Sequence, residues 1–219
     1  MLNIGVVERI HSKAPAKNPK DSKIIKKAGK IITQKGVVIF PAQYFYGIAV
    51  DALNIDAVQK VFNLKKRSLQ NPLLVLIKNR SQLEKLVDSI PDIAEKLIEE
   101  YWPGHVTIIF KANRQVVPDL ITAKTGKIGL RMPLHPVAKA LVTAANRPIT
   151  GTSANISGQP GCNRIDRISP DIIKNADLTL DSGELKTGLG STVVDVTKGI
   201  PEILRQGQIS KSEILNTCA

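Results

Sequence analysis

The sequence has few of the residues on which several classes of protein depend. It contains two cysteines, Cys162 and Cys218, and three histidines among 219 residues. Two cysteines are too few for the disulfide framework of a small secreted domain. The histidines (His11, His105 and His135) are too widely spaced to form a zinc cluster. We therefore predict reduced thiols and no metal site built from protein ligands.

Long apolar segments are also missing. The longest apolar runs, such as Leu73 to Ile77, have the length of a strand and are far too short to cross a bilayer. Near the N-terminus, Glu8 and Arg9 interrupt the apolar residues before they reach the length of a signal peptide's apolar core. The sequence therefore predicts a cytoplasmic protein that has no membrane partner.

Acidic residues are scarce relative to basic ones. Lys and Arg outnumber Asp and Glu by 31 to 19, and before Val37 nine basic residues face only Glu8 and Asp21. A basic surface raises the local concentration of polyanions such as ATP or RNA. Aromatic residues are only 4% of the chain, and none lies among the N-terminal lysines, so stacking on bases is unsupported there. For those lysines alone we favour a solubilising helix face.

Helix and strand patterns alternate along most of the chain. Periodicity and end signals predict helices that begin near residues 24, 54, 81, 91, 137 and 210, the third with a capping box at Ser81 and Glu84. Short apolar runs predict strands at 37–40, 48–50, 73–77, 106–110, 128–132, 148–151, 178–180, 192–196 and 203–204. This alternation predicts one α/β domain over residues 19–210, preceded by an extended basic arm (1–18) and followed by a short tail (211–219).

Lys65 and Arg67 are the first candidates for a ligand site. Residues two apart in an extended segment project to the same side, so both cations could meet one anion. Arginine offers phosphate a planar fork and lysine a compact charge. The alternative is a solvated pair at the end of a helix, where the helix dipole favours cations. From these two residues alone, the solvated pair is the safer interpretation.

Ser153 and Asn155 have the same spacing, in a segment flanked by Gly151 and Ala154. Short side chains allow a ligand to approach the backbone. A helix that starts after Asn155 would offer its free N–H groups to phosphate. A Ser- and Asn-rich turn that merely caps this helix is an equally good interpretation.

Common nucleotide and nucleophile motifs are missing. The chain has no G-x-x-x-x-G-K-[ST] loop, and Gly188-Leu189-Gly190 does not complete a dinucleotide fingerprint. The segment from Gly151 to Asn155 lacks the last glycine of a nucleophile elbow. If ATP binds, it must therefore be held in another way.

Seven segments, taken in order, resemble those of the YrdC-like family. They are Pro41 to Gly47 (Pro-x-x-x-x-Tyr-Gly), Lys65-x-Arg67 with Asn71-Pro72-Leu73, Trp102-Pro103-Gly104 with Thr107, Arg131 to Pro136, Ser153 to Gly158, Ser191 to Asp195, and Ile203 to Gly207. Each segment is a weak signal by itself. Their common order over roughly residues 20–210 is hard to explain by chance.

The resemblance implies a fold and an activity. The fold is a single α/β domain in which a twisted mixed sheet, flanked by helices, surrounds a large basic concave groove. The activity is that of a nucleotidyltransferase, which condenses L-threonine, bicarbonate and ATP into threonylcarbamoyl-AMP and releases pyrophosphate. Mg²⁺ would bridge the phosphates, and the tRNA threonylcarbamoyl-transferase machinery would pass the product to tRNA. The family's longer members have a further C-terminal domain, which this sequence is expected to lack.

The resemblance also implies roles for particular residues. The family's catalytic polar set corresponds to Lys65, Arg67, Ser153 and Asn155. Nucleotide contacts would come from Lys65, Arg67, Asn155, Asn163 and Arg205. The threonine would be held by Arg131, Ser153 and Ser191, with Arg131 pairing with its carboxylate. Attack of a carbamate oxygen on the α-phosphate needs positioning and charge neutralisation more than an acid–base pair, and such a set supplies both.

Two departures from the family pattern motivate other interpretations. The family usually has Pro-Thr-Glu or Pro-Thr-Asp where this chain has Pro41-Ala42-Gln43, and many members have His in place of Leu76. In the family both positions lie on the amino-acid side of the pocket. A second interpretation is therefore an ATP-dependent enzyme with a different acceptor. A third is a non-catalytic module that binds double-stranded RNA or tRNA in the basic groove.

Overall fold

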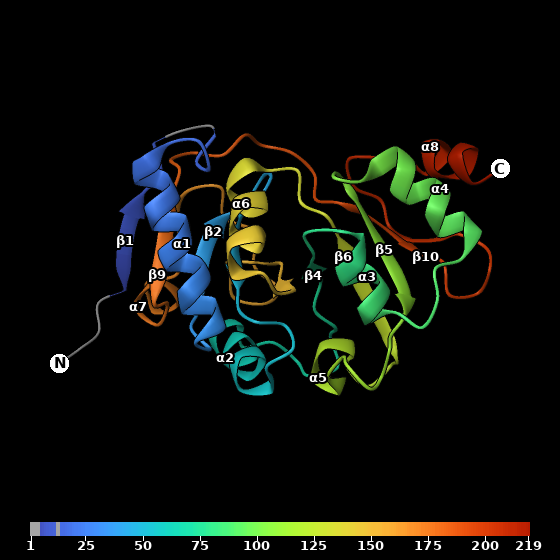
Figure 1. The fold of residues 1–219 in the computed structure, drawn as a ribbon, viewed down its shortest axis with the longest axis horizontal. Coiled ribbons are helices and arrows are strands. Elements are labelled where there is room, and N and C mark those ends of the chain that lie inside the picture. The colour runs from blue at the N-terminus through green and yellow to red at the C-terminus, as the bar shows by residue number, and fades with distance from the viewer. Residues whose placement is uncertain (1–4, 12–13) are drawn as a thin grey trace.

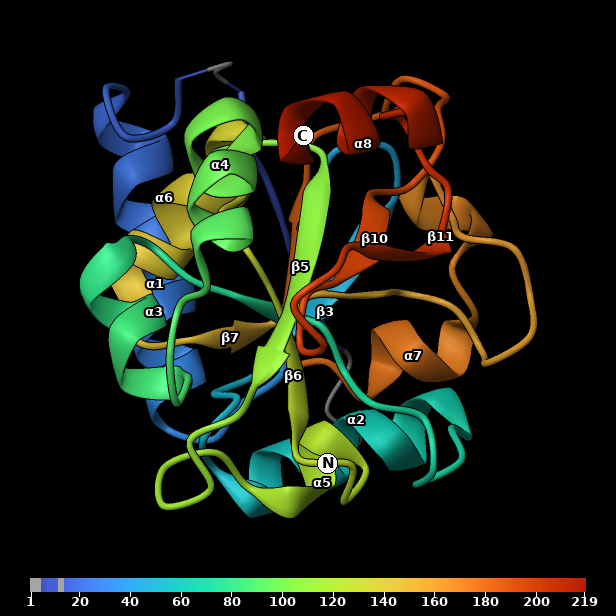
Figure 2. The same ribbon diagram turned by 90° about the vertical axis from the view of Figure 1, so that its right-hand side faces the viewer.

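Strands from all parts of the chain form two mixed sheets in this computed structural model, which describes residues 5–11 and 14–219. In order, the first sheet contains β1 (Val6–Arg9), β9 (Leu178–Asp181), β2 (Val38–Pro41), β3 (Tyr46–Ala49) and β8 (Thr152–Ser153). The second contains β11 (Glu202–Arg205), β10 (Thr192–Asp195), β5 (Val106–Lys111), β6 (Lys127–Arg131), β4 (Val75–Leu76) and β7 (Ile149–Thr150). Figures 1 and 2 show the two sheets from perpendicular directions. The predicted α/β class with mixed parallel and antiparallel pairing is confirmed, but there are two sheets where one was expected.

The segment from Ile149 to Ser153 connects the two sheets. It contributes β7 to one sheet and β8 to the other, and Gly151 lies at the change of sheet. The Gly151 N–H donates to the Leu74 carbonyl oxygen at 2.9 Å. A Cβ at this position would lie 2.8 Å from Leu76 Cγ, closer than van der Waals contact permits. The crossing therefore depends on a residue without a side chain.

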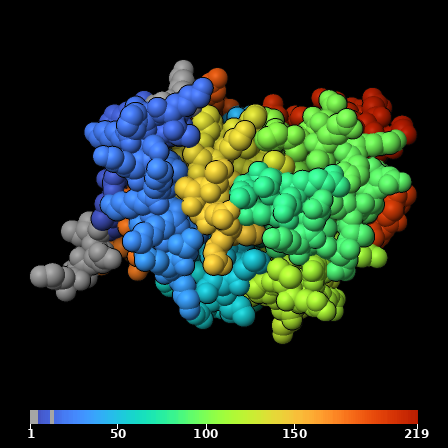
Figure 3. All heavy atoms as spheres, in the orientation of Figure 1, coloured from blue at the N-terminus to red at the C-terminus, as the bar shows by residue number. Residues whose placement is uncertain are grey.

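Eight α-helices cover the described sheets. They are α1 (Pro19–Thr33), α2 (Ile55–Lys65), α3 (Arg80–Leu86), α4 (Asp92–Tyr101), α5 (Asp119–Thr122), α6 (Pro136–Ala145), α7 (Pro170–Lys174) and α8 (Lys211–Cys218). In the space-filling view, side chains of α1, α6 and α3 form one continuous surface over the same side of the molecule (Figure 3). None of the described helices combines the length and apolar composition needed to span a bilayer.

Helices α1 and α6 pack together against the first sheet. Their buried residues, such as Ile25 on α1 and Leu141 on α6, join Val38 and Leu178 of the sheet in one apolar cluster. The helix axes can approach closely at Gly29, where an added Cβ would lie 2.7 Å from the carbonyl carbon of Ala144. Because backbone atoms cannot move aside cheaply, this contact requires glycine.

Replacing Gly29 with valine should therefore destabilise the protein by roughly 2–3 kcal/mol, since overpacking forces the two helices apart. Urea denaturation followed by circular dichroism would measure the loss. Lys26→Val is the matched control, because Lys26 lies on the exposed face of the same helix and the change there alters only helix propensity. Equal midpoints for the two variants would contradict the close contact.

Most predicted elements are present, but α5 and α7 were not predicted, and three further points differ. The capping box at Ser81 is wrong: α3 begins at Arg80, and the Asn79 side chain caps it by accepting from the Gln82 N–H at 3.1 Å. The region predicted as an extended arm contains β1, which pairs in parallel with β9. The helix predicted near residue 210 is present as α8, but it occupies the residues assigned to the tail and packs against α4. Residues 1–4 and 12–13 of the arm lie outside the described chain.

Candidate active site

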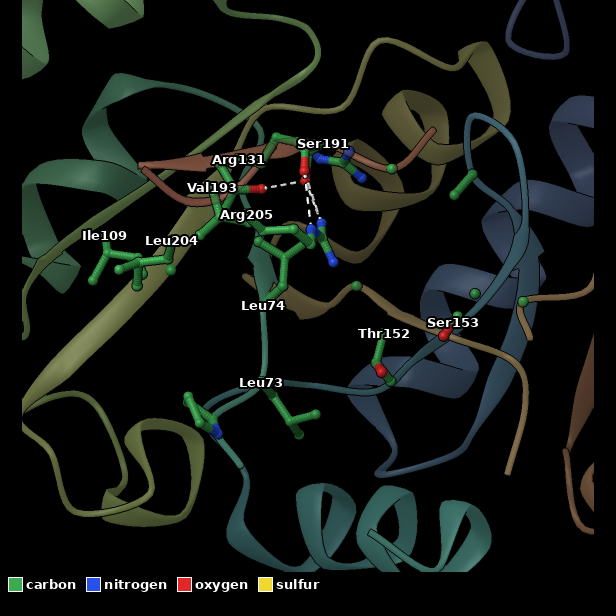
Figure 4. Close-up of a pocket in the computed structure, with 18 of the residues that line it drawn as sticks. Leu73, Leu74, Ile109, Arg131, Thr152, Ser153, Ser191, Val193, Leu204 and Arg205 are labelled. Carbon is green, nitrogen blue, oxygen red and sulfur yellow. Dashed lines mark hydrogen bonds between the residues drawn. The ribbon is translucent and has the colours of Figure 1, made fainter. Parts of the chain in front are cut away.

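A cavity of about 930 Å³ is lined by residues from both sheets and their loops. Its walls include the loop from Ala42 to Phe45, the residues that precede β4, and strands β5, β6, β10 and β11. Figure 4 shows Arg131, Ser191 and Arg205 on one side and Thr152 and Ser153 on the other, with Leu74 below Arg205 and Leu73 lower in the view. The volume lies in the range of small-molecule sites.

Six of the eight residues predicted for the site line this cavity: Arg67, Arg131, Ser153, Asn155, Ser191 and Arg205. Two do not, namely Lys65 and Asn163. The cavity thus gathers residues from segments far apart in the chain. It is the proximity of these segments, rather than any one motif, that makes a site.

Lys65 is buried beneath the cavity wall. Its ammonium group donates to Asn155 O at 2.8 Å, to Asn155 Oδ1 at 3.0 Å, and to the carbonyl oxygen of Ser153. These three acceptors match the three N–H donors of a protonated lysine. Burial, with a smaller contribution from the neighbouring Arg67 charge, lowers the Lys65 pKa to about 8. Lys65 therefore holds the Ser153–Asn155 segment in place and is not the solvated helix-end residue of the alternative interpretation.

Arg67 lines the cavity, but not because of an extended backbone. Lys65 is the last residue of α2, and Lys66 takes the left-handed conformation with φ 49°. This reversal turns Arg67 away from the helix. In the loop that follows, its guanidinium donates to Asn71 O at 3.2 Å and to Pro72 O at 2.8 Å. These bonds use Nε and Nη2 and leave Nη1 for a ligand. The two cations therefore take different positions, one under the wall and one in it.

The segment after β8 is a turn, so the predicted helix at Asn155 is wrong. Residues 154–161 contain turns and bends, and Gly158 has a φ of 86°. The Asn155 side chain stabilises this turn by accepting from the Ser153 hydroxyl and donating to Ile156 O at 3.1 Å. A polar turn is present, as in the alternative interpretation, but no helix directly follows it for the turn to cap. Any anion here would meet side chains and individual backbone groups, not a helix N-terminus.

Ser191, Arg131 and Arg205 form the opposite wall. The Arg205 guanidinium donates to the Ser191 carbonyl oxygen at 2.8 Å, and the Ser191 and Thr107 hydroxyls lie 2.7 Å apart. Burial, with a smaller contribution from the Arg205 charge, lowers the Arg131 pKa to about 10. Two arginines held close together without an intervening carboxylate favour a bound anion.

The charge of the lining is unbalanced. Five cations line the cavity with two carboxylates, Asp195 and Glu202. Both carboxylates are already paired: Lys127 Nζ lies 2.7 Å from Asp195 Oδ2, and Lys198 Nζ lies 3.1 Å from Glu202 Oε2. The remaining three cations are Arg67, Arg131 and Arg205, and none of them makes an ion pair within the described chain. These three charges would attract a polyanion such as a triphosphate.

Asn163 stabilises a loop at the edge of the site. Its Nδ2 donates to Leu185 O at 3.3 Å, and the Leu185 N–H donates back to Asn163 O at 2.9 Å. These bonds hold the start of the loop that leads to Leu189 and Ser191, which line the cavity. The structure therefore gives Asn163 a supporting position.

The wall also contains an aromatic contact that the sequence did not predict. The rings of Tyr44 and His105 stack with centroids 5.9 Å apart and an interplanar angle of 17°. A Cβ at Gly188 would also lie 2.5 Å from the Tyr44 ring. Tyr44 thus joins three segments: its own loop, the residue before β5, and the Gly188 loop. The signal that could have found it was an aromatic residue inside a recognised loop motif.

The two departures from the family pattern lie in different surroundings. Ala42 lines the cavity, whereas Leu76 is completely buried and packs in the apolar cluster of α1 and α6. The expectation that Leu76 belongs to the substrate side of the pocket is therefore not met by its position.

Replacing Leu76 with histidine should destabilise the protein by roughly 2–4 kcal/mol, because it places an imidazole without a partner among apolar side chains. Leu76→Met, which keeps the site apolar, should cost less than about 1.5 kcal/mol. Urea midpoints would compare the two variants. A histidine variant as stable as the methionine variant would contradict this placement.

The described residues contain no group of three or more His, Cys, Asp or Glu side chains that could hold a metal ion. The two carboxylates of the cavity are occupied by lysines, as described above. A divalent ion that enters with a nucleotide would find few protein ligands here, and phosphate oxygens and water would have to supply most of its coordination.

Comparison with known proteins identifies the family. The profile of the family Sua5_yciO_yrdC, described as "Telomere recombination", matches residues 30–207. Threonylcarbamoyl-AMP synthases from Pyrococcus abyssi and Bacillus subtilis are 36% and 35% identical to the chain over 190 residues, which is 87% of its length. The chain spans 56% and 55% of these two relatives. A putative threonylcarbamoyl-AMP synthase from Methanocaldococcus jannaschii is 33% identical over 85% of this chain and 87% of its own length.

Solved structures agree with this result. P. abyssi Sua5 complexed with L-threonine superposes with a TM-score of 0.85 at 34% identity, covering 98% of this chain and 60% of that one. E. coli YciO superposes with a TM-score of 0.83 over 96% of this chain and 99% of its own, and at 24% identity this likeness supports the fold alone. The predicted family is confirmed: the chain belongs to the Sua5/YciO/YrdC family.

Proposed function

We propose that this chain is an L-threonylcarbamoyladenylate synthase. L-threonine and bicarbonate combine to a carbamate, and one carbamate oxygen attacks the α-phosphorus of ATP. Pyrophosphate leaves, and threonylcarbamoyl-AMP and water are the other products. The observation that carries this proposal is the set of three arginines, Arg67, Arg131 and Arg205, which line one cavity without carboxylate partners in the described chain. The names of the relatives and the threonine bound to P. abyssi Sua5 support it.

The two walls of the cavity suggest a division of labour. Arg67, Ser153 and Asn155 would contact the triphosphate on one side, with Lys65 holding their segment from below. Arg205 would add a nucleotide contact on the other side, and Asn163 would support its loop. Arg131 would pair with the threonine carboxylate, next to Ser191, and Ser153 would lie near the reacting atoms. Fixed cations placed where charge moves from the α-phosphate to pyrophosphate lower the barrier without an acid–base pair.

ATP enters this scheme as its magnesium complex. Mg²⁺ keeps several waters and binds through phosphates in many nucleotide sites, which fits a cavity whose two carboxylates are paired with lysines. It would neutralise part of the phosphate charge. The positioning of the two reactants remains the task of the protein's own residues.

A pyrophosphate-release assay tests the proposal. With MgATP alone the purified chain should release little pyrophosphate, and release should require both L-threonine and bicarbonate. Omitting either one serves as the control. Release that is indifferent to threonine and bicarbonate would disprove the synthase activity.

A second candidate keeps the chemistry but changes the acceptor. It is favoured by one observation: Ala42 and Gln43, where the family usually has Thr and an acidic residue, both line the cavity. A panel of amino acids in the same assay would identify the acceptor. Ala42→Thr should then improve the use of threonine, and an unchanged preference would argue against this candidate.

The proposed reaction also implies a partner enzyme that uses its product. We place the protein in the cytoplasm, where a tRNA threonylcarbamoyl-transferase would consume the adenylate. The net charge of +12 favours direct binding of tRNA or double-stranded RNA through their phosphates. Steeply salt-dependent tRNA binding without pyrophosphate release would favour a non-catalytic RNA-binding module instead.

A further inference from the structure

A small recess lies beside the large cavity. Its volume is about 10 Å³, and Ala42, Gln43 and Arg131 belong to the walls of both spaces. His135, at the start of α6, closes the recess from the other side together with Ala138. The recess is therefore a small pocket that shares Arg131 with the large cavity.

Three residues that line this recess each carry a buried polar atom without a partner. Gln43 Oε1, Arg131 Nε and His135 Nδ1 are buried, and no described protein group forms a hydrogen bond with them. They make up half of the six buried side-chain atoms of this kind in the described chain. Because a buried polar atom without a hydrogen bond is costly, three such atoms on residues that line one recess indicate a bound polar group.

The size and chemistry of the recess fit one water molecule. A cavity of roughly 10–15 Å³ holds a single water, which requires two to four polar partners. Arg131 Nε can only donate, and Gln43 Oε1 can only accept. A water that accepts from Nε keeps two protons, one for Gln43 Oε1 and one for His135 Nδ1. All three atoms are then satisfied by one molecule.

This arrangement requires a neutral histidine with its proton on Nε2. Burial lowers the His135 pKa to about 4, so the ring is neutral near pH 7. A neutral imidazole has one donor and one acceptor nitrogen, and the neighbours decide which is which. Arg131 Nε donates to the water, so the water's own two protons must go to acceptors. Gln43 Oε1 is one acceptor, and His135 Nδ1 must be the other.

We propose that Gln43 and His135 hold one buried water against Arg131 Nε, and that this water fixes the orientation of the Arg131 guanidinium. No hydrogen bond or ion pair of the described chain uses this guanidinium, so its rotation is otherwise restrained by packing alone. The water engages Nε and leaves Nη1 and Nη2 for an anion in the large cavity. Gln43 and His135 are thus positioning residues. The part of this inference that concerns threonine rests on the proposed function.

A crystal structure of the full chain at about 1.5 Å tests the water directly. We expect a density peak within about 3.2 Å of Gln43 Oε1, Arg131 Nε and His135 Nδ1. His135→Asn should keep it, because an asparagine oxygen can take the place of Nδ1, and His135→Leu should lose it. A wild-type map without this peak, or with Gln43 Oε1 bonded directly to Arg131 Nε, would overturn the proposal whether or not the chain is a synthase.

Kinetics test the positioning. In His135→Leu the KM for L-threonine should rise about fivefold, the effect of one hydrogen bond, while kcat and the KM for ATP change less than about twofold. His135→Asn should behave as the wild type, and melting curves would confirm that both variants fold. Loss of the water without a change in the threonine KM would refute the positioning role. In the wild-type protein, an Nδ1 nitrogen shift typical of a protonated nitrogen would refute the water's contacts without reference to activity.

Discussion

Lys65→Met should lower the free energy of unfolding by about 2–4 kcal/mol and also abolish most pyrophosphate release. The ammonium group donates three hydrogen bonds to the Ser153–Asn155 segment from a fully buried position. Methionine preserves much of the apolar stem but removes all three hydrogen bonds and leaves Asn155 O without a donor, while Asn155 Oδ1 still accepts from the Ser153 hydroxyl and Ser153 O from the Asn155 N–H. The turn that carries Ser153 and Asn155 then loses its support. Urea denaturation and the pyrophosphate assay, performed on the same preparation, would measure both effects.

The pH dependence gives a second measurement of the same residue. Because the folded state lowers the Lys65 pKa from 10.5 to about 8, the unfolded chain binds this proton more tightly between those two values. The stability of the wild type relative to Lys65→Met should therefore rise with pH across this window. Lys66→Met is the control, since the Lys66 side chain is exposed. The same lysine-to-methionine change is made there at the C-cap of α2, next to Lys65. An equal loss of stability in both variants would show that Lys65 is not the anchor.

Arg67→Leu should have the opposite profile, with a large loss of activity and little loss of stability. Arg67 lies in the cavity wall, and its two hydrogen bonds end on the carbonyl oxygens of a partly exposed loop. Removing one fixed charge from a phosphoryl-transfer site costs roughly 10²–10³-fold in rate. The free energy of unfolding should change by less than about 1 kcal/mol, as for most substitutions away from the core. The pyrophosphate assay under saturating and limiting ATP would separate kcat from KM.

Arg167→Leu is the matched control for this variant. Arg167 is exposed and does not line the cavity. Its replacement therefore removes the same charge, but from another part of the surface. It should retain nearly full activity. If the two variants lost activity equally, a general effect of net charge on ATP attraction would explain the result, and Arg67 would have no special place.

Local sequence signals predicted the elements well because those signals act over a few residues. Asn54 caps α2 as expected, accepting from the Ala57 N–H at 3.0 Å. The capping box at Ser81 failed because Asn79, two residues earlier, offers an equally good acceptor and the helix starts there. The strand β1 was missed because its pairing with β9 is a contact across more than 160 residues, which no local pattern reports.

Most of the residues predicted for the site line one cavity, but their arrangement was not predicted. Motif order brought Arg67, Arg131, Ser153, Asn155, Ser191 and Arg205 together correctly as residues of one cavity. The same motifs could not distinguish Lys65 and Asn163, which support the wall, from residues that form it. Polar residues in a motif look alike in sequence whether they contact a ligand or hold the group that does.

The sequence by itself determined the alternation of helices and strands, the excess of positive charge, and the family to which the chain belongs. These properties depend on residue type and on spacing within short segments. Only the tertiary structure decided which cations face the cavity, that Leu76 belongs to the core, and that Gln43, Arg131 and His135 meet at one recess. The physical reason is that burial and hydrogen bonding are set by segments that are distant in the chain and become neighbours only when the two sheets and their helices pack together.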